Sequence, residues 1–134
     1  MKKKKVLVVD DELDMRIYIS TVFETSGYEA VTARDGKDGL AKARKLLPDL
    51  IILDIMMPGE GGVLMYRHLK SDDVLKDIPV LMLSGVGKQT FFHYLKMMNI
   101  QPDDAIPEPE AYVEKPPKPN ELLEIAESLL RPAA

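Results

Sequence analysis

The chain alternates short apolar runs with stretches in which apolar residues recur every three or four positions. An unbroken run such as residues 50–53 is typical of a strand that is buried on both faces. The recurrence of Met15, Ile19 and Phe23 indicates one face of a helix, which Ser26 and Gly27 end. The same pattern along the chain predicts strands at residues 6–9, 28–33, 50–53, 78–83 and 111–113, and helices at about 15–25, 35–47, 63–70, 88–98 and 120–130.

The order of these elements is strand then helix, repeated along the whole chain. Helices between buried strands indicate parallel strands joined by right-handed crossovers. A closed barrel needs eight such units and about 250 residues, which this chain does not have. The pattern therefore predicts an α/β fold with an open, doubly wound sheet of five parallel strands and helices on both faces. We expect residues 1–134 to form a single domain with its core at about 4–130.

Composition narrows the class of protein without identifying it. The 134 residues include 18 basic and 22 acidic side chains, a formal charge of −4, which argues against a nucleic-acid grip over the whole surface. There is no cysteine, so thiolate metal sites and disulfides are excluded. The apolar run after the lysines at 2–5 is too short for an export signal, and no run is long enough to span a bilayer. We expect a cytoplasmic protein without membrane contact.

Reactive side chains follow four of the five predicted strands. In doubly wound sheets, sites form beyond the carboxyl ends of the strands. Asp10 and Asp11 follow the first strand, Asp54 the third, Ser84 the fourth, and Lys115 the fifth. We therefore expect these side chains to meet at one edge of the sheet.

Neighbouring carboxylates at such an edge repel one another unless a cation lies among them. Mg²⁺ takes one or two carboxylates together with phosphate oxygens, and an ammonium and a hydroxyl beside it would complete a site for phosphoryl transfer. Taken singly, Asp10–Asp11 and Ser84 could each cap a helix, Asp54 could form a turn, and Lys115 could be an ordinary surface lysine. Their agreement on one edge favours the site.

The sequence resembles the receiver domain of two-component response regulators, and the resemblance runs from about residue 4 to residue 130. The motifs that carry it are Val8-Val9-Asp10-Asp11-Glu12, Leu53-Asp54-Ile55-Met56-Met57-Pro58-Gly59, Leu83-Ser84-Gly85 and Tyr112-Val113-Glu114-Lys115-Pro116. The resemblance implies a flavodoxin-like sheet order of 2-1-3-4-5, as in the chemotaxis receiver that illustrates this order.

The resemblance also implies a role for each matching residue. Asp54 matches the phosphoacceptor, and Lys115, preceding a cis Pro116, matches the lysine that pairs with the phosphoryl group. Ser84 and Tyr112 match the two residues that switch on phosphorylation. The implied Mg²⁺ ligands are Asp10, Asp11, Asp54 and the backbone carbonyl of Met56.

These roles imply a stand-alone, chemotaxis-receiver-like phosphorelay protein, not an enzyme beyond its own phosphorylation and dephosphorylation. The expected partners are a histidine kinase or phosphotransfer protein, a downstream protein target and, on phosphorylation, a second copy of the chain. The expected signalling face is the fourth helix, fifth strand and fifth helix. Because the last predicted helix ends near residue 130, we expect no DNA-binding domain in this chain and no direct contact with nucleic acid.

The sequence departs from the family pattern in three places. Gly61 stands where the family often has Asp, which we expect to loosen that loop. Met56 and Val86 are apolar beside the expected phosphoryl site and cannot orient an attacking water, so we expect a long-lived phosphoryl state. The acidic, proline-containing stretch at residues 99–110 is an insertion that forms either a solvated loop or a partner-specific contact.

Three other functions remain as alternatives. The first is a protein-binding module with this fold that is not phosphorylated. The second is a Mg²⁺-dependent phosphatase with an Asp nucleophile, although the expected Asp-x-Asp spacing is missing from Asp10-Asp11-Glu12. The third is a flavin protein, although three acids after the first strand disfavour a phosphate without a metal. His68 and His93 are expected to be ordinary helix or surface residues.

Overall fold

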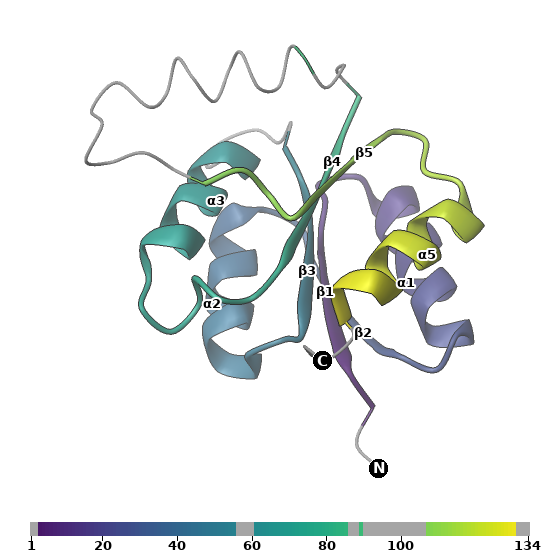
Figure 1. The fold of residues 1–134 in the computed structure, drawn as a ribbon, viewed down its shortest axis with the longest axis horizontal. Helices are drawn as coiled ribbons and strands as arrows, with labels where there is room; N and C mark the ends of the chain where they lie inside the picture. Colours follow the sequence, from purple (N-terminus) through teal and green to yellow (C-terminus); the bar gives the residue numbers. More distant parts are fainter. Residues whose placement is uncertain (1–2, 56–60, 86–88, 90–106, 131–134) are drawn as a thin grey trace.

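The computed structural model describes residues 3–55, 61–85, 89 and 107–130. Five parallel strands form one sheet in the order β2-β1-β3-β4-β5, which confirms the predicted doubly wound fold. Figure 1 shows α2 and α3 on one side of this sheet and α1 and α5 on the other. The elements are β1 (Lys5–Val9), α1 (Leu13–Thr25), β2 (Glu29–Ala33), α2 (Gly36–Leu46), β3 (Leu50–Asp54), α3 (Gly62–Ser71), β4 (Val80–Ser84), β5 (Ala111–Glu114) and α5 (Pro119–Leu130).

The fourth strand begins two residues later than its apolar run predicts. The Ile78 amide donates to the Leu75 carbonyl, so residue 78 still belongs to the turn after α3. Pro79 has no N–H to donate, but its carbonyl accepts from the Ile51 amide of β3 at 3.0 Å. The ladder of β4 therefore starts at Val80. Of the predicted helix at residues 88–98, only Gln89 lies within the described residues.

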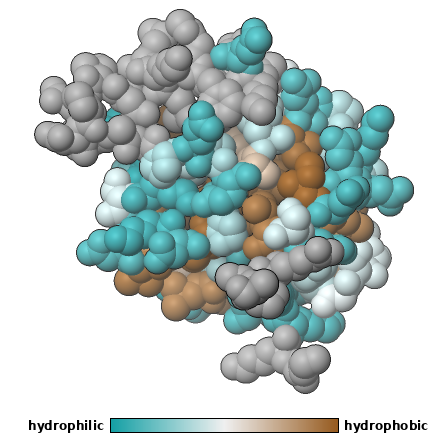
Figure 2. Space-filling model, in the orientation of Figure 1, coloured by the Kyte–Doolittle hydropathy of each residue, from teal (hydrophilic) through white to brown (hydrophobic). Residues whose placement is uncertain are grey.

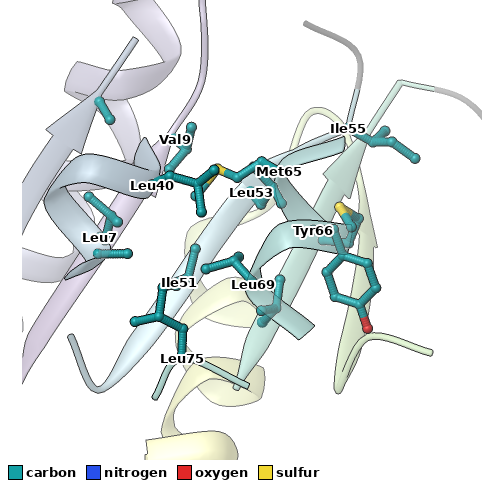
Figure 3. Close-up of a cluster of buried hydrophobic side chains, with 14 of the residues drawn as sticks. Leu7, Val9, Leu40, Ile51, Leu53, Ile55, Met65, Tyr66, Leu69 and Leu75 are labelled. Carbon is teal, nitrogen blue, oxygen red and sulfur yellow. The ribbon is translucent and has the colours of Figure 1, made fainter. Parts of the chain in front are cut away.

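The apolar runs of the central strands fill two separate cores. Alternate residues of a strand point to opposite faces, so Leu7 and Val9 pack beneath α2 and α3 while Val6 and Val8 pack beneath α1 and α5. Figure 3 shows the first of these cores, with Met65 and Leu69 of α3 lying against the sheet. Burial on both faces is the reason that these strands have no polar alternation.

Close packing between α2 and α3 depends on a small residue. A Cβ at Gly39 would lie 2.8 Å from Cε of Met65 and 3.0 Å from Cγ2 of Val9. The helix itself begins at an N-cap, because the Asp35 carboxylate accepts a hydrogen bond from the Asp38 amide at 2.8 Å. Because residue 39 is a glycine, α2 packs closely against Val9, the last residue of β1.

Among the described residues, the exposed large apolar side chains are Leu13, Ile17, Tyr18, Leu47, Leu64 and Val74. Figure 2 shows hydrophobic surface in the region of β5 and α5, flanked by hydrophilic residues. Leu13 and Ile17, one turn apart on α1, are the most exposed large apolar side chains of that helix, at 60% and 54%. Among the described residues, no helix has the length and apolar character needed to cross a membrane.

Candidate functional site

Three buried polar side chains lie together at the carboxyl edge of the sheet. Asp10, Asp54 and Ser84 are each at most 2% exposed. Strand register brings them together, because β3 lies between β1 and β4, and Asp54 is paired with Leu83, the residue before Ser84. Burying two carboxylates beside each other is costly unless a positive charge compensates them.

Lys115 supplies that positive charge. Its ammonium lies 2.9 Å from Oδ2 of Asp10, 3.2 Å from Oδ2 of Asp54 and 3.3 Å from Oε1 of Glu12. The backbone N–H of Lys115 donates to the Ser84 carbonyl at 2.8 Å, which anchors the residue directly after β5. The expected cis bond between Lys115 and Pro116 is present.

The ammonium is held in its charged form. Burial by itself lowers the pKa of Lys115, but the hydrogen bond that its ammonium donates to Asp10 and the charge of Asp54 raise it, and the net pKa lies above its ordinary value. The side chain is only 13% exposed, so these interactions are less screened than those of a surface pair. A charged lysine at this edge attracts anionic groups.

The loop after β1 offers a set of oxygen ligands. Carboxylate oxygens of Asp10, Asp11 and Glu12 lie within 4.8 Å of one another, and Asp11 and Glu12 are exposed. Asp10 is oriented from both sides, since its Oδ1 accepts from the Glu12 amide at 2.9 Å and its carbonyl from Nη1 of Arg16 at 2.7 Å. Its buried Oδ2 faces the Lys115 ammonium at 2.9 Å. A set of carboxylate oxygens that includes the buried Oδ2 of Asp10 fits a hard divalent cation.

Ser84 and Tyr112 are joined on neighbouring strands. Burial raises the pKa of Tyr112, a hydrogen bond with the Ser84 side chain opposes that effect, and the charge of Glu114 adds to it, so the net pKa is raised. Tyr112 lies opposite Met82 in the ladder, two residues before the position of Ser84. Any group that draws the Ser84 hydroxyl away would therefore change the surroundings of Tyr112.

Two residues of this edge were not assigned a role from the sequence. Glu12 contacts the Lys115 ammonium from 103 positions away, and its place beside the acidic pair was the available signal. Gly62 begins α3 against the end of β3: its amide donates to the Ile55 carbonyl at 3.2 Å, and a Cβ there would lie 2.1 Å from the Asp54 carbonyl oxygen. We expected this glycine pair to loosen the loop, whereas Gly62 itself is closely packed.

Several expectations fall on other parts of the chain. Met56, the expected backbone ligand, lies outside the described residues, as do Val86 and His93. His68 is exposed on α3, as expected of a surface residue. Of the expected insertion at 99–110, residues 107–110 are described and the others are not.

The fold and this edge define a class of protein: a doubly wound α/β domain with a buried acidic site and a lysine at the carboxyl ends of its strands. The sequence matches the response regulator receiver domain across residues 6–127, and the chain belongs to that family. Receiver domains of this family are signalling modules of two-component systems rather than classical enzymes.

Known relatives agree with this assignment. The chain is 34% identical over 131 residues to the phosphate regulon transcriptional regulatory protein PhoB of Pseudomonas aeruginosa, covering 98% of this chain and 53% of that protein. It is 34% identical to the alkaline phosphatase synthesis transcriptional regulatory protein PhoP of Bacillus subtilis, covering 96% of this chain and 49% of that one. The chain thus spans about half the length of these curated relatives.

A solved structure with the same fold is the chemotaxis response regulator CheY4 of Vibrio cholerae. It superposes with a TM-score of 0.81 at 30% identity, covering 96% of this chain and all of that one. The similarity therefore includes a receiver whose whole structure corresponds to this chain.

Proposed function

We propose that this receiver accepts a phosphoryl group on Asp54 in the presence of Mg²⁺ and transmits the change through its β5 surface. The observation that carries the proposal is the position of Asp54: its buried carboxylate lies 3.2 Å from the Lys115 ammonium and one strand away from the acidic loop after β1. A nucleophile, a countercharge and a set of metal ligands thus share one edge.

The transfer uses the carboxylate as nucleophile. An oxygen of Asp54 forms the new bond to phosphorus while the bond from phosphorus to the donor breaks, and the donor nitrogen of a phosphohistidine leaves with the bonding electrons. Lys115 then pairs with the phosphoryl oxygens instead of sharing its charge among carboxylates. This exchange supplies electrostatic stabilisation where negative charge accumulates.

Asp10, Asp11 and Asp54 are the side chains that would hold the metal, together with the backbone carbonyl of Met56. When bound, Mg²⁺ neutralises charge on the phosphoryl oxygens and orients them. The hydrogen bonds donated by the Glu12 amide and the Arg16 guanidinium keep Asp10 in place for this role. Oxygen ligands around a carboxylate nucleophile support Mg²⁺ over softer metals.

Ser84 and Tyr112 would carry the signal outward. The Ser84 hydroxyl now bonds to Tyr112, and a phosphoryl group on Asp54 offers it a stronger, charged acceptor. Loss of the Ser84 bond lets Tyr112 turn inward and changes the face formed by the predicted fourth helix, β5 and α5. This is a two-state element biased by a local charge.

The partners proposed for this chain are proteins. A histidine kinase or phosphotransfer protein would supply the phosphoryl group, and a downstream protein or a second copy of the chain would bind the switched face. A cytoplasmic location suits phosphoryl donors of this kind. The names of PhoB and PhoP describe transcriptional regulators about twice as long as this chain, and we propose no contact of this receiver domain with nucleic acid.

The decisive experiment measures the intact mass after incubation with Mg²⁺ and a small acyl phosphate. We expect one added phosphoryl group in the wild type and none in Asp54→Asn or without Mg²⁺. Asp77→Asn, which removes an exposed carboxylate after α3, is the matched control and should be phosphorylated like the wild type.

Absence of the adduct would favour the alternative of a binding module that is not phosphorylated. Beryllofluoride separates this outcome from a poor donor, because it occupies the acceptor site without a transfer step. If neither the adduct nor binding of beryllofluoride is found in the folded protein, the proposed phosphorylation is wrong. The family assignment disfavours the phosphatase and flavin alternatives.

A further inference from the structure

The segment that enters β5 is fastened to α3 and to the start of β4. The Tyr66 hydroxyl donates to the Pro107 carbonyl at 2.6 Å. Three residues later, the two carboxylate oxygens of Glu110 accept from different donors: Oε1 from the Lys70 ammonium at 2.9 Å and Oε2 from the Val80 amide at 2.8 Å. We call Tyr66, Lys70, Val80, Pro107 and Glu110 the β5 clasp.

Lys70 makes the clasp more than a surface ion pair. Its side chain is only 5% exposed, against 35% for Glu110. The ammonium also donates to the carbonyls of Lys76 at 3.2 Å and Ile78 at 3.3 Å, and it lies 5.7 Å from the centre of the Tyr66 ring. A buried ammonium needs such a complete set of partners, and Glu110 is the one that carries the opposite charge.

The Glu110 side chain also takes the place of a backbone hydrogen-bond acceptor in the sheet. Val80 is fully buried, and its N–H would need an acceptor on the β5 side of β4. The first paired residue of β5 is Ala111, opposite Leu81, so the side chain of Glu110 completes the ladder where backbone pairing has not yet begun. The side chain thereby marks where β5 starts.

The register of β5 matters because it decides which faces its side chains take and where Lys115 lies. It is an edge strand of four residues, paired with β4 alone. A slip of one residue would turn Tyr112 and Val113 to the opposite faces of the sheet. It would also displace Lys115, whose amide bonds to Ser84 at the other end of the strand.

Figure 3 supports this arrangement from the side of the core. Tyr66 lies at the border of the buried cluster, and its hydroxyl points away from the other labelled side chains. The ring is part of the core while the hydroxyl serves the segment before β5. One side chain thus joins the core to the clasp.

We propose that the β5 clasp sets the register of β5, and that Glu110 is through it a positioning residue for Lys115. The residues concerned are separated by 41 positions for Tyr66 and Pro107 and by 40 for Lys70 and Glu110. The part of the proposal that concerns phosphorylation rests on the proposed function, whereas the register of β5 can be tested independently.

The test compares Glu110→Gln with Glu108→Gln, which removes an exposed carboxylate from the same segment and changes the net charge equally. Amide hydrogen exchange is followed at Lys115, at the far end of β5 from the clasp. Gln has one acceptor oxygen where Glu has two, so either the Lys70 ammonium or the Val80 amide loses its acceptor and the start of β5 is loosened. We therefore expect the Lys115 amide of Glu110→Gln to exchange about tenfold faster than in the wild type. Glu108→Gln should match the wild type.

Phosphorylation by a small acyl phosphate is measured on the same proteins. We expect the rate at saturating donor to fall about tenfold in Glu110→Gln, since a displaced lysine costs rate even when it is present. The Mg²⁺ concentration for half-maximal rate should not rise in this variant, because a displaced ammonium competes less with the ion for Asp10 and Asp54. Lys70→Arg, which keeps the cation, should retain more of the rate than Lys70→Met.

The outcomes are distinct. If the Val80 amide of Glu110→Gln exchanges faster but the Lys115 amide exchanges as in the wild type, the clasp is a local contact and the proposal is overturned. An unchanged phosphorylation rate in a variant whose Lys115 amide exchanges faster would also overturn it. If Glu110→Gln does not fold, Tyr66→Phe removes only the hydroxyl bond to Pro107 and gives the same two readouts. If the wild type is not phosphorylated, the proposed function fails, and exchange at Lys115 still decides the role of the clasp.

Discussion

At the scale of single residues, Lys115 is the centre of the candidate site. One ammonium contacts carboxylates of Asp10, Glu12 and Asp54, which belong to two different strand ends. Four acidic side chains surround the site once Asp11 is included, so the edge keeps a net negative charge that a divalent cation would reduce. The lysine and a metal are thus alternative ways to compensate the same carboxylates.

Replacing this lysine should expose that relation. We expect Lys115→Met to lower the free energy of unfolding by about 2 kcal/mol at low salt, because two buried carboxylates lose their countercharge. Saturating Mg²⁺ should stabilise the variant more than the wild type, since the ion then binds without a competing ammonium. Urea unfolding with and without Mg²⁺ measures both effects. Lys118→Met, at an exposed lysine of the same loop, is the control, and an equal Mg²⁺ response in all three proteins would contradict the prediction.

A second residue bears on the lifetime of the phosphoryl group. Met56, two positions after Asp54, has no group that could orient water for attack on phosphorus. We expect Met56→Asn to shorten the lifetime about tenfold, within the range that one positioned hydrogen-bonding group contributes. Loss of the added mass over time measures the rate, with Met56→Leu as the apolar control. Equal lifetimes in the wild type and Met56→Asn would refute the idea.

At the scale of elements, the junction of β3 with α3 decides how closely the helix approaches the phosphoacceptor. The amide of Gly62 bonds to the carbonyl of Ile55, and no side chain fits between α3 and the backbone of Asp54. The first turn of α3 therefore packs against the backbone of the phosphoacceptor, and the last turn of the same helix carries Lys70 of the β5 clasp. Small displacements of α3 would move both.

A methyl group at this junction should disturb stability and site together. We expect Gly62→Ala to lower the free energy of unfolding by about 2 kcal/mol or more, because its Cβ would meet backbone that cannot rotate away. Phosphorylation of Asp54 should slow in the same variant. Gly85→Ala is the matched control, since its Cβ would enter open space, and its stability should change by less than about 0.5 kcal/mol. Similar losses in the two variants would count against the crowding.

At the scale of the whole molecule, each of the two cores has a tyrosine whose pKa is raised by burial, Tyr66 in one and Tyr28 in the other. Burial, and after it the charges of Glu110 and Glu108, raise the pKa of Tyr66 far above its ordinary value. Burial and the charge of Glu127 raise the pKa of Tyr28 on the other face of the sheet. With Lys115, these groups keep their protons in the folded protein at pH values where the unfolded chain releases them.

Stability should therefore fall in alkaline solution. The unfolded pKa values are about 10 for tyrosine and about 10.4 for lysine, so the folded protein holds more protons above them and loses stability as pH rises further. At pH 10.5 we expect Tyr66 to account for a loss of about 1 kcal/mol relative to pH 8, and Tyr28 and Lys115 to change stability in the same direction. Urea unfolding at the two pH values measures it. Tyr66→Phe should lose less than the wild type between them, and an equal loss would contradict the assignment to Tyr66.

Much of this protein was predictable from the order of its residues. The strands are apolar because both faces of the sheet are covered, and the reactive side chains follow strand ends because parallel strands place those ends at one edge. Asp10, Asp54, Ser84 and Lys115 could be found in this way without knowledge of their contacts. A boundary such as that of β4 could not, because the turn bond of Ile78 and the missing N–H of Pro79 act against an apolar run.

Tertiary structure decided what depends on distance across the fold. Three contacts could not be read from any local sequence pattern, because their residues come from different elements. They are the contact of Glu12 with Lys115, the packing of Gly62 against the Asp54 backbone, and the ion pair of Lys70 with Glu110. Periodicity reports which side of an element is buried, but not which side chain of another element lies opposite. The sequence alone therefore determined the fold, the edge and the chemistry available there. The packing of the folded chain determined which charges meet, because only the finished sheet sets their separations.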